Sequence, residues 1–469
     1  MKIAFMHYHL KPGGVATVLH QQLQAVSNSC QCLVLTGQAP ASTMPADVCV
    51  VPGLGYDRRH HPAQPKKTAH AVRDAILSRW PGGCDVLHVH NPLLAKNSHL
   101  LDILQHLQRE GLRLFLQIHD FAEDGRPQVY FRREYPADCH YGVINARDYR
   151  LLRDCGLRAD GLHLLPNAVT PPAAGMPGTP VRPHGLLYPV RAIRRKNVGE
   201  AILLSLFFAP PQPLRITLPP NSPADMPAYE GWKALAAQEG LDVHFEAGLS
   251  RNFADLMRSA GLVLTTSITE GFGFCFMEPW LYEKPLWGRM LPDICRDFTE
   301  KGVRLDHLYT NLWVPTGWIP LDEFFDRWRK AATEAAQAFG RRLTEDALKE
   351  AFAALTARNR VDFGMLDETL QRRVVRKILQ QSRHLDALRR LNPFLQRTER
   401  LPCSPEDIAH NAHIIRKNYN LQVYGHRLLA IYRQVCSRAV HQRIDKAKLL
   451  DFFFDLRQLS LLKWGRDEA

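Results

Sequence analysis

Short apolar segments alternate with amphipathic helical patterns over most of the first 270 residues, and this alternation constrains the fold more than any other feature. Strands of this kind are typical of parallel sheets that are covered by helices on both faces. The segments that predict strands in the first half are Lys2–His7, Cys32–Leu35, Val48–Val51, Val86–His90, Arg113–Ile118, Tyr141–Ile144 and His163–Leu165. The helical patterns between them lie at about Val15–Val26, Lys66–Arg79, Ser98–Gln108 and Ala146–Cys155.

A proline-rich segment interrupts this alternation, with five prolines in the fourteen residues from Thr170 to Pro183. Proline continues neither a helix nor a central strand, so residues 171–184 are predicted to be a linker. The alternation then resumes, with strands expected at Gly185–Val190, Leu214–Leu218, Val243–Phe245 and Leu262–Thr266, and helices from Asn197, near Trp232–Gln238 and near Phe253–Arg258. A chain of 469 residues exceeds one ordinary core. We therefore predict an α/β protein with two Rossmann-like, doubly wound domains at 1–170 and 185–320 that face a cleft.

The character of the chain changes from about Leu321 onward. Residues 321–357, 366–391 and 405–462 are charged, periodic and nearly free of glycine, which predicts a helical C-terminal extension over 321–469. This extension could brace both domains, bind an acceptor or pair with another subunit, and the sequence does not distinguish these roles.

The composition is that of a soluble globular protein, with 45% hydrophobic and 23% charged residues. No run is long enough to span a bilayer, and the N-terminal residues move directly into a strand without a leader-like segment. A cytoplasmic location is the expectation. The ten cysteines show no paired spacing and are interpreted as reduced thiols.

The formal charge of +13 favours an anionic partner. A solvated surface accounts for most of these charges, while a nucleotide sugar or a peripheral contact with an anionic membrane would give the excess a purpose. No basic run interleaved with aromatic residues is present, so nucleic acid is not an expected partner.

The strongest local motif is Thr269–Glu278, which follows the apolar run that ends at Ser267. It predicts a buried strand, a turn through Gly271, Phe272 and Gly273, and a helix that begins near Phe274. Glu270 and Glu278 then lie beside a helix N-terminus, whose N–H groups attract phosphate while the carboxylates accept sugar hydroxyls. The alternative is an exposed loop acid and a solvent-facing helix acid.

A second motif is the basic loop Arg191–Asn197, at a strand end that leads into a helix. Arg191 and Lys196 can converge on one anion as the chain turns, because arginine binds a diphosphate bidentately and lysine acts as a point charge. Exposed basic residues are also common in solvated loops.

A third motif follows the first strand, where Gly13 and Gly14 precede a helix. Paired glycines let a ligand approach the backbone closely, although the loop does not match G-x-G-x-x-G and a tight turn explains it equally well.

Histidines gather at strand ends as His7, His9, His88, His90 and His119. A zinc site is an alternative, but no acidic or cysteine ligand accompanies them at a diagnostic spacing. His119 with Asp120 is suited to hydrogen bonding a hydroxyl. No D-x-D pair occurs, so the charge of a leaving diphosphate must be met by Arg191, Lys196 and helix N-termini and not by a carboxylate-held Mg²⁺.

These motifs, in this order, resemble the retaining nucleotide-sugar glycosyltransferases of family 4, which have the GT-B fold. The resemblance covers about residues 1–290 and rests on five motifs: Pro12-Gly13-Gly14-Val15, His119-Asp120, Pro166-Asn167, Arg191 with Lys196, and Glu270-x7-Glu278. Pro279-Trp280 and Pro285–Arg289 depart from the family's pattern.

The resemblance implies a role for each matching residue. Gly13, Gly14 and Asn167 would contact the donor, His119 would contact the transferred sugar, and Arg191 and Lys196 would hold the diphosphate. Glu270 would bind sugar hydroxyls, Gly271, Phe272 and Gly273 would present the backbone, and Glu278 would bind the ribose.

The implied function is retaining, metal-independent sugar transfer from a nucleotide-diphosphate sugar to an unidentified hydroxyl acceptor, without a cofactor. Front-face transfer would let the leaving diphosphate help deprotonate the acceptor. The alternatives are a GT-B phosphorylase or epimerase, or a catalytically silent sugar-nucleotide-binding subunit.

Overall fold

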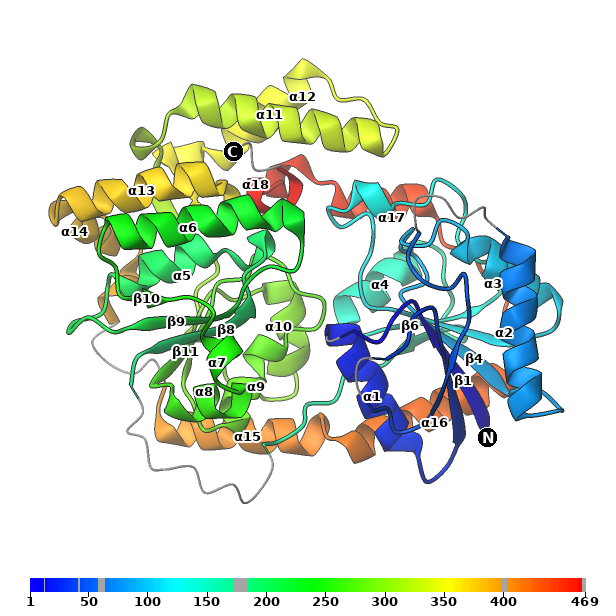
Figure 1. Cartoon of the computed structure of the whole chain (residues 1–469). Coiled ribbons are helices and arrows are strands. Elements are labelled where there is room, and N and C mark those ends of the chain that lie inside the picture. The colour runs from blue at the N-terminus through cyan, green and yellow to red at the C-terminus, as the bar shows by residue number, and fades with distance from the viewer. Residues whose placement is uncertain (12, 41–42, 58–63, 173–183, 398–402, 466–469) are drawn as a thin grey trace. The chain divides into compact units, whose positions relative to one another are not determined.

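A computed structural model describes residues 1–11, 13–40, 43–57, 64–172, 184–397 and 403–465. The chain divides into two compact units. The first comprises residues 1–170 and 418–454, and the second comprises 171–417 and 455–469 (Figure 1). Of the linker predicted at 171–184, residues 173–183 lie outside the described part.

The first unit is built on a seven-stranded parallel sheet with the order β3-β2-β1-β4-β5-β6-β7. The strands are β1 (Lys2–His7), β2 (Gln31–Thr36), β3 (Asp47–Val50), β4 (Val86–His90), β5 (Leu114–Ile118), β6 (His140–Val143) and β7 (Leu162–Leu164). The strand order reverses between β1 and β4, so the carboxyl ends of these two strands flank the topological switch point.

Helices cover both faces of this sheet, as the alternation in β1 requires. Ile3 and Phe5 enter the core beneath α1 (Gly14–Val26) and α16 (Leu421–Ser437). Ala4 and Met6 enter the core on the other face, where α2 (Pro65–Arg79), α3 (Leu100–Arg109), α4 (Ala146–Asp154) and α17 (Lys446–Phe453) contribute. Successive strand residues point to opposite faces, which explains the continuous apolar runs in the sequence.

The second unit contains a five-stranded parallel sheet with the order β10-β9-β8-β11-β12. Its strands are β8 (Leu186–Arg191), β9 (Leu214–Leu218), β10 (Val243–His244), β11 (Leu262–Thr265) and β12 (Leu286–Gly288). The switch point lies between β8 and β11, which are paired in register through Leu186 and Leu262. The basic loop Arg191–Asn197 and the acidic motif Thr269–Glu278 therefore follow the carboxyl ends of two neighbouring strands.

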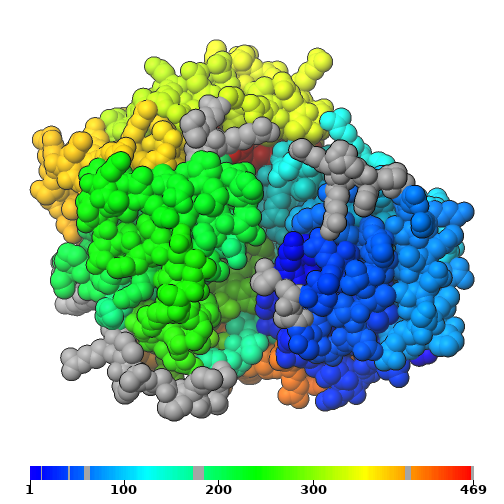
Figure 2. All heavy atoms as spheres, in the orientation of Figure 1, coloured from blue at the N-terminus to red at the C-terminus, as the bar shows by residue number. Residues whose placement is uncertain are grey.

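Helices α5 (Val198–Ser205), α6 (Met226–Gln238), α8 (Phe253–Ser259) and α10 (Pro292–Thr299) accompany this sheet. Helix α13 (Glu368–Gln380) packs against α5 and α6. The remaining helices of the C-terminal part are α11 (Leu321–Ala338), α12 (Glu345–Leu355), α14 (Arg383–Leu391), α15 (Pro405–Asn418) and α18 (Leu461–Trp464). In the space-filling view, the yellow and orange-yellow atoms of α11–α14 adjoin the green atoms of α6 (Figure 2).

Each strand predicted for the two sheets is present, with ends that differ by at most one residue. The extension proposed over 321–469 is divided, since residues 418–454 belong to the first unit. Its helical patterns are interrupted by β14 (Arg360–Asp362), which pairs antiparallel with β13 (Trp313–Pro315) and was not predicted. Among the described residues, no helix combines the length and apolar character that crossing a bilayer requires.

The helix expected to begin near Phe274 is wrong in extent. Phe274–Phe276 forms a single 3-10 turn, and α9 covers only Glu278–Leu281. Gly273 has φ 92°, a left-handed conformation that separates the turn from the strand, and Met277 is not helical. The N-terminal N–H groups expected there therefore belong to one turn and not to a long helix.

Candidate active site

The switch point of the second sheet joins two motif-bearing loops. The backbone N–H of Ile268 donates to the Arg195 carbonyl at 3.0 Å. The Thr266 hydroxyl donates to the carbonyls of Lys196 at 3.1 Å and Asn197 at 3.0 Å. The buried Tyr188 hydroxyl also donates to the Lys196 carbonyl. These bonds fix the basic loop against the segment that carries Glu270.

Lys196 and Glu270 form an ion pair between the two loops, with the Lys196 Nζ donating to Glu270 Oε1. Their side chains are only 15% and 11% exposed. Burial opposes ionisation of Glu270, but Lys196 and Arg195 outweigh it and hold its pKa below the ordinary value. Glu270 is therefore a carboxylate at neutral pH, and its free oxygen positions can accept hydroxyl groups.

The other basic residues of the loop differ in their contacts. Arg191 Nη1 donates to the Pro219 carbonyl at 3.1 Å, and the side chain stays half-buried. Among the described residues, the Arg195 guanidinium has no hydrogen bond or ion pair, although it lies close enough to Glu270 to lower that pKa. In the sequence, only the position of Arg195 within the basic cluster indicates it, and no motif assigns it a role.

Arg194 has a structural role. Its guanidinium binds Glu368 bidentately, with both N–O distances at 2.8 Å, and it donates to the Leu461 carbonyl at 3.1 Å and to the Gly465 carbonyl. This contact joins the basic loop to α13 and to the segment that contains α18. The sequence did not indicate the ion pair between Arg194 and Glu368, because the two residues are far apart along the chain.

The Gly271–Gly273 turn is shaped by internal packing. Phe272 is buried, with its ring 5.0 Å from Phe274 and 5.8 Å from Phe298. At Gly273, a Cβ would lie 2.9 Å from the Phe276 ring and 3.1 Å from Ile294, in addition to the left-handed φ. Glycine is required there by the chain itself.

Glu278 opens α9 and is partly buried. Within the described part of the chain, its carboxylate has no hydrogen bond or ion pair. Burial raises its pKa to about 7. It is thus a hydroxyl or proton acceptor that no protein group has already engaged.

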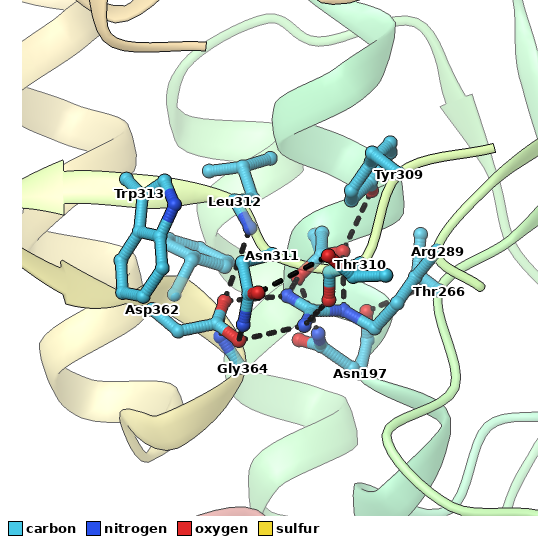
Figure 3. A network of polar contacts seen from close by, with 12 residues as sticks. Asn197, Thr266, Arg289, Tyr309, Thr310, Asn311, Leu312, Trp313, Asp362 and Gly364 are labelled. Atoms are coloured by element: carbon cyan, nitrogen blue, oxygen red, sulfur yellow. Dashed lines mark hydrogen bonds and ion pairs between the residues drawn. The ribbon is translucent and has the colours of Figure 1, made fainter. Parts of the chain in front are cut away.

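A buried polar network lies beside the two loops and includes Asn197, Thr266, Arg289 and Asp362 (Figure 3). Arg289, just after β12, binds Glu200 and Asp362, with closest N–O distances of 2.6 and 2.7 Å. Glu200 also accepts from Asn197 at 2.7 Å and from Tyr309 at 2.7 Å. Arg289 thereby connects the start of α5 with β14.

The carboxylates of this network differ in their pKa shifts. Burial raises the pKa of Glu200 against the opposing effect of Arg289, whereas Arg289 overcomes burial and lowers the pKa of Asp362. Arg289 lies in the segment that departs from the family pattern, and its partners were not found from the sequence.

In the first unit, Gly13 and Gly14 lie between the end of β1 and helix α1. Among the described residues, a Cβ on Gly14 would meet no atom within 4 Å, and one on Gly13 would come only within 3.9 Å of the Lys11 carbonyl oxygen. Internal packing therefore does not require glycine at either position. The open space is what a ligand approaching the backbone needs.

His119 follows β5 and is buried. Its Nε2 lies 2.9 Å from His90 Nδ1, and its backbone N–H donates to Asn91 Oδ1 at 2.8 Å. Burial lowers the pKa of His119 to about 4, so the ring is neutral near pH 7. The neighbouring Asp120 accepts from Arg126 at 2.8 Å.

The other histidines surround this pair. His7, His88 and His90 are buried, and burial lowers the pKa of each. His9 instead bonds the Tyr56 hydroxyl at 2.9 Å. Over the described ranges, no group of three or more His, Cys, Asp or Glu side chains is arranged to hold a metal ion.

Asn167 lies three residues after β7 and is buried. Its side-chain Oδ1 has no hydrogen-bond partner in the part of the chain that the structure describes. An unsatisfied buried amide oxygen is costly unless a ligand or water supplies a donor.

The doubly wound sheets and the comparisons with solved structures identify the GT-B fold, which confirms the predicted fold class. Sucrose-phosphate synthase from Thermosynechococcus elongatus superimposes with a TM-score of 0.53 at 13% identity, over 92% of this chain and 98% of that protein. HepE from Anabaena in complex with UDP-glucose gives a TM-score of 0.53 at 13% identity, over 92% and 99%.

A curated relative is mannosylglucosyl-3-phosphoglycerate synthase from Petrotoga mobilis, which is 26% identical over 335 residues. The alignment covers 62% of this chain and 65% of that protein, less than two-thirds of either. No protein-family model matches the chain.

Proposed function

We propose that the chain is a retaining, metal-independent glycosyltransferase of family 4 that moves a sugar from a nucleotide-diphosphate sugar to a hydroxyl acceptor. The observation that carries this proposal is the buried Lys196–Glu270 pair at the switch point of the second sheet. Open α/β sheets bind ligands at this position, and the pair offers a cation for phosphate beside a carboxylate for hydroxyls.

The donor would be held mainly by charge. Lys196, Arg195 and Arg191 supply three cations from one loop, which suit the two phosphates of the donor and the charge that develops on the leaving diphosphate. The pKa of Glu270 is low enough that the carboxylate is ionised and accepts hydrogen bonds from hydroxyls of the transferred sugar. Glu278 would accept the ribose hydroxyls.

Catalysis would follow from stabilising the leaving group. As the bond from the anomeric carbon to the diphosphate oxygen breaks, negative charge grows on that oxygen near the basic loop. The same oxygen takes the proton of the acceptor hydroxyl, which attacks from the face that the diphosphate leaves and so retains the configuration.

Four residues of the first unit would also bind substrate, namely Gly13, Gly14, Asn167 and His119. Gly13 and Gly14 leave the backbone open to a phosphate, and the unsatisfied Oδ1 of Asn167 offers an acceptor. His119 would contact the transferred sugar. Since the HepE structure is a complex with UDP-glucose, UDP-linked sugars are the first donors to test.

Thermal shift with nucleotide diphosphates and their sugars tests the proposal, since a bound donor stabilises the native state. We expect one nucleotide to raise the melting temperature, and product formation with hydroxyl acceptors to follow with retained configuration. A shift without turnover on any acceptor would favour a silent binding subunit. Turnover that requires inorganic phosphate and a disaccharide would favour a phosphorylase, and no shift with any nucleotide would contradict the assignment.

A further inference from the structure

Two histidine pairs in the first unit have the same geometry but different surroundings. His90 Nδ1 lies 2.9 Å from His119 Nε2, with ring centroids 5.2 Å apart and planes inclined by 18°. His140 Nδ1 lies 2.9 Å from His163 Nε2, with centroids 5.2 Å apart and planes inclined by 14°. In each pair one ring nitrogen must donate and the other must accept, because burial lowers the pKa of all four rings.

The direction of the hydrogen bond within each pair depends on Nε2 of His140 or His90, the ring nitrogen that does not contact the other histidine. In the second pair, His140 Nε2 lies 2.9 Å from the Arg438 carbonyl, which can only accept. His140 therefore carries its proton on Nε2, its Nδ1 accepts, and His163 Nε2–H is the donor.

The first pair has no such carbonyl. His90 is 1% exposed, and its Nε2 has no hydrogen-bond partner among the described residues. A buried N–H without an acceptor is rarer and more costly than a buried lone pair without a donor. The proton of His90 therefore belongs on Nδ1, from which it donates to His119 Nε2.

We infer that His90 is a positioning residue that fixes the neutral His119 ring in its Nδ1–H form. With Nε2 engaged as an acceptor, His119 presents one N–H donor at Nδ1, which has no hydrogen bond to any described residue. On the proposed function, that donor would be available to an oxygen of the transferred sugar and would select for an acceptor atom there. The ring cannot act as a base at Nδ1.

The tautomer is measured directly by two-bond ¹⁵N–¹H correlation NMR on the full chain labelled with ¹⁵N-histidine. Signals are assigned by their loss in His119→Asn and His163→Asn. We expect protonation of His119 on Nδ1 and of His163 on Nε2, so that the two rings serve as opposite internal standards. Protonation of His119 on Nε2, or a positive charge on it near pH 7, would overturn the inference.

Substitution of His90 tests its role. The Asn amide nitrogen can take the place of His90 Nδ1 and still donate, whereas Leu fills similar space without a donor. We expect His90→Leu to release His119 into mixed tautomers and to lower kcat/KM by roughly 3- to 10-fold, the range of one neutral hydrogen bond. His90→Asn should restore the Nδ1–H form and most of the activity.

The spectroscopic result separates the two ideas. An Nδ1–H His119 that changes in His90→Leu supports the positioning role even if no sugar is transferred, in which case only the proposed function fails. An unchanged His119 tautomer in a folded His90→Leu variant would overturn the positioning role while leaving the function intact.

Discussion

At the scale of single residues, the Lys196 ammonium and the Glu270 carboxylate form an ion pair without a ligand. The opposite charges offset part of the cost of removing an ammonium and a carboxylate from water. On the proposed function, a donor diphosphate and sugar hydroxyls would add to charges that are already in place. This is electrostatic preorganisation.

We predict that Lys196→Ala and Glu270→Ala each lower kcat by at least about 100-fold, because each removes a charge that acts on the leaving group or on the transferred sugar. Steady-state transfer assays measure the loss. Lys301→Ala, which removes an exposed lysine in the same unit, is the matched control and should leave turnover unchanged. Normal turnover in either test variant would contradict the assignment.

Glu278 predicts a pH dependence of stability. Burial raises the pKa of Glu278 to about 7 in the folded chain, so folding favours the protonated carboxyl group over the carboxylate. The stability that this protonated group contributes is therefore lost as the pH rises to about 7. Glu278→Gln removes this loss. We expect the stability advantage of the variant over the natural chain to grow between about pH 4.5 and about pH 7, where it reaches roughly 3 kcal/mol, and to level off at higher pH.

Chemical denaturation at several pH values measures this gain, with exposed Glu283→Gln as the control. Donor binding should have the opposite sign. On the proposed function, ribose hydroxyls would stabilise the ionised Glu278, so the donor Kd should fall as pH rises through 7 and should lose that dependence in Glu278→Gln. A flat difference in stability across this range would disprove the raised pKa.

At the scale of elements, the ion pair between Arg194 and Glu368 fastens the basic loop to α13. The two side chains are 9% and 3% exposed. Removal of one partner leaves the other charge buried, so we predict that Glu368→Ala lowers the free energy of unfolding by about 3–5 kcal/mol. Urea denaturation measures this loss.

The exposed pair of Arg457 and Glu350 is the matched control, with side chains 65% and 74% exposed. Glu350→Ala should cost less than about 1 kcal/mol, because solvent screens the pair. Equal losses in the two variants would show that the Arg194 contact does not hold the loop.

Elements defined by local pattern could be predicted from the sequence, and those defined by distant partners could not. The apolar strands have short-range signals, so the first sheet and strands β8–β11 of the second were predicted closely, and Glu270, Lys196 and His119 follow predicted strands, whereas β12 was not predicted. A Cβ at Gly273, just before the 3-10 turn, would lie 3.1 Å from Ile294, and no local pattern reveals that contact. The Arg194–Glu368 and Arg289–Asp362 contacts likewise join residues far apart along the chain.

At the scale of the whole molecule, residues 418–454 complete the first unit. In α16, Leu428 and Tyr432 belong to the core that also contains Phe5, and Gly425 approaches α1 so closely that a Cβ would lie 2.5 Å from the Ala25 carbonyl oxygen. The backbone N–H of Val169 donates to the Tyr419 carbonyl at 2.7 Å, which brings the two parts of the unit together.

We predict that a fusion of residues 1–170 to 418–454 through a short linker folds as one α/β domain. Residues 1–170 alone should lack cooperative unfolding, because one face of the sheet would lose α16 and expose its apolar surface. Circular dichroism melts and limited proteolysis of both fragments measure this difference. Cooperative unfolding of 1–170 alone would contradict it.

The return of the chain to the first unit has a consequence for synthesis. Domains near an N-terminus usually fold first as they leave the ribosome, at about 5–20 residues per second. This unit acquires the helices α16 and α17 only after residue 454 has been made, so its sheet must wait for the intervening unit. During that interval, the nascent chain presents apolar strand residues without their covering helix, and chaperones that bind such surfaces should engage it until the last segment emerges.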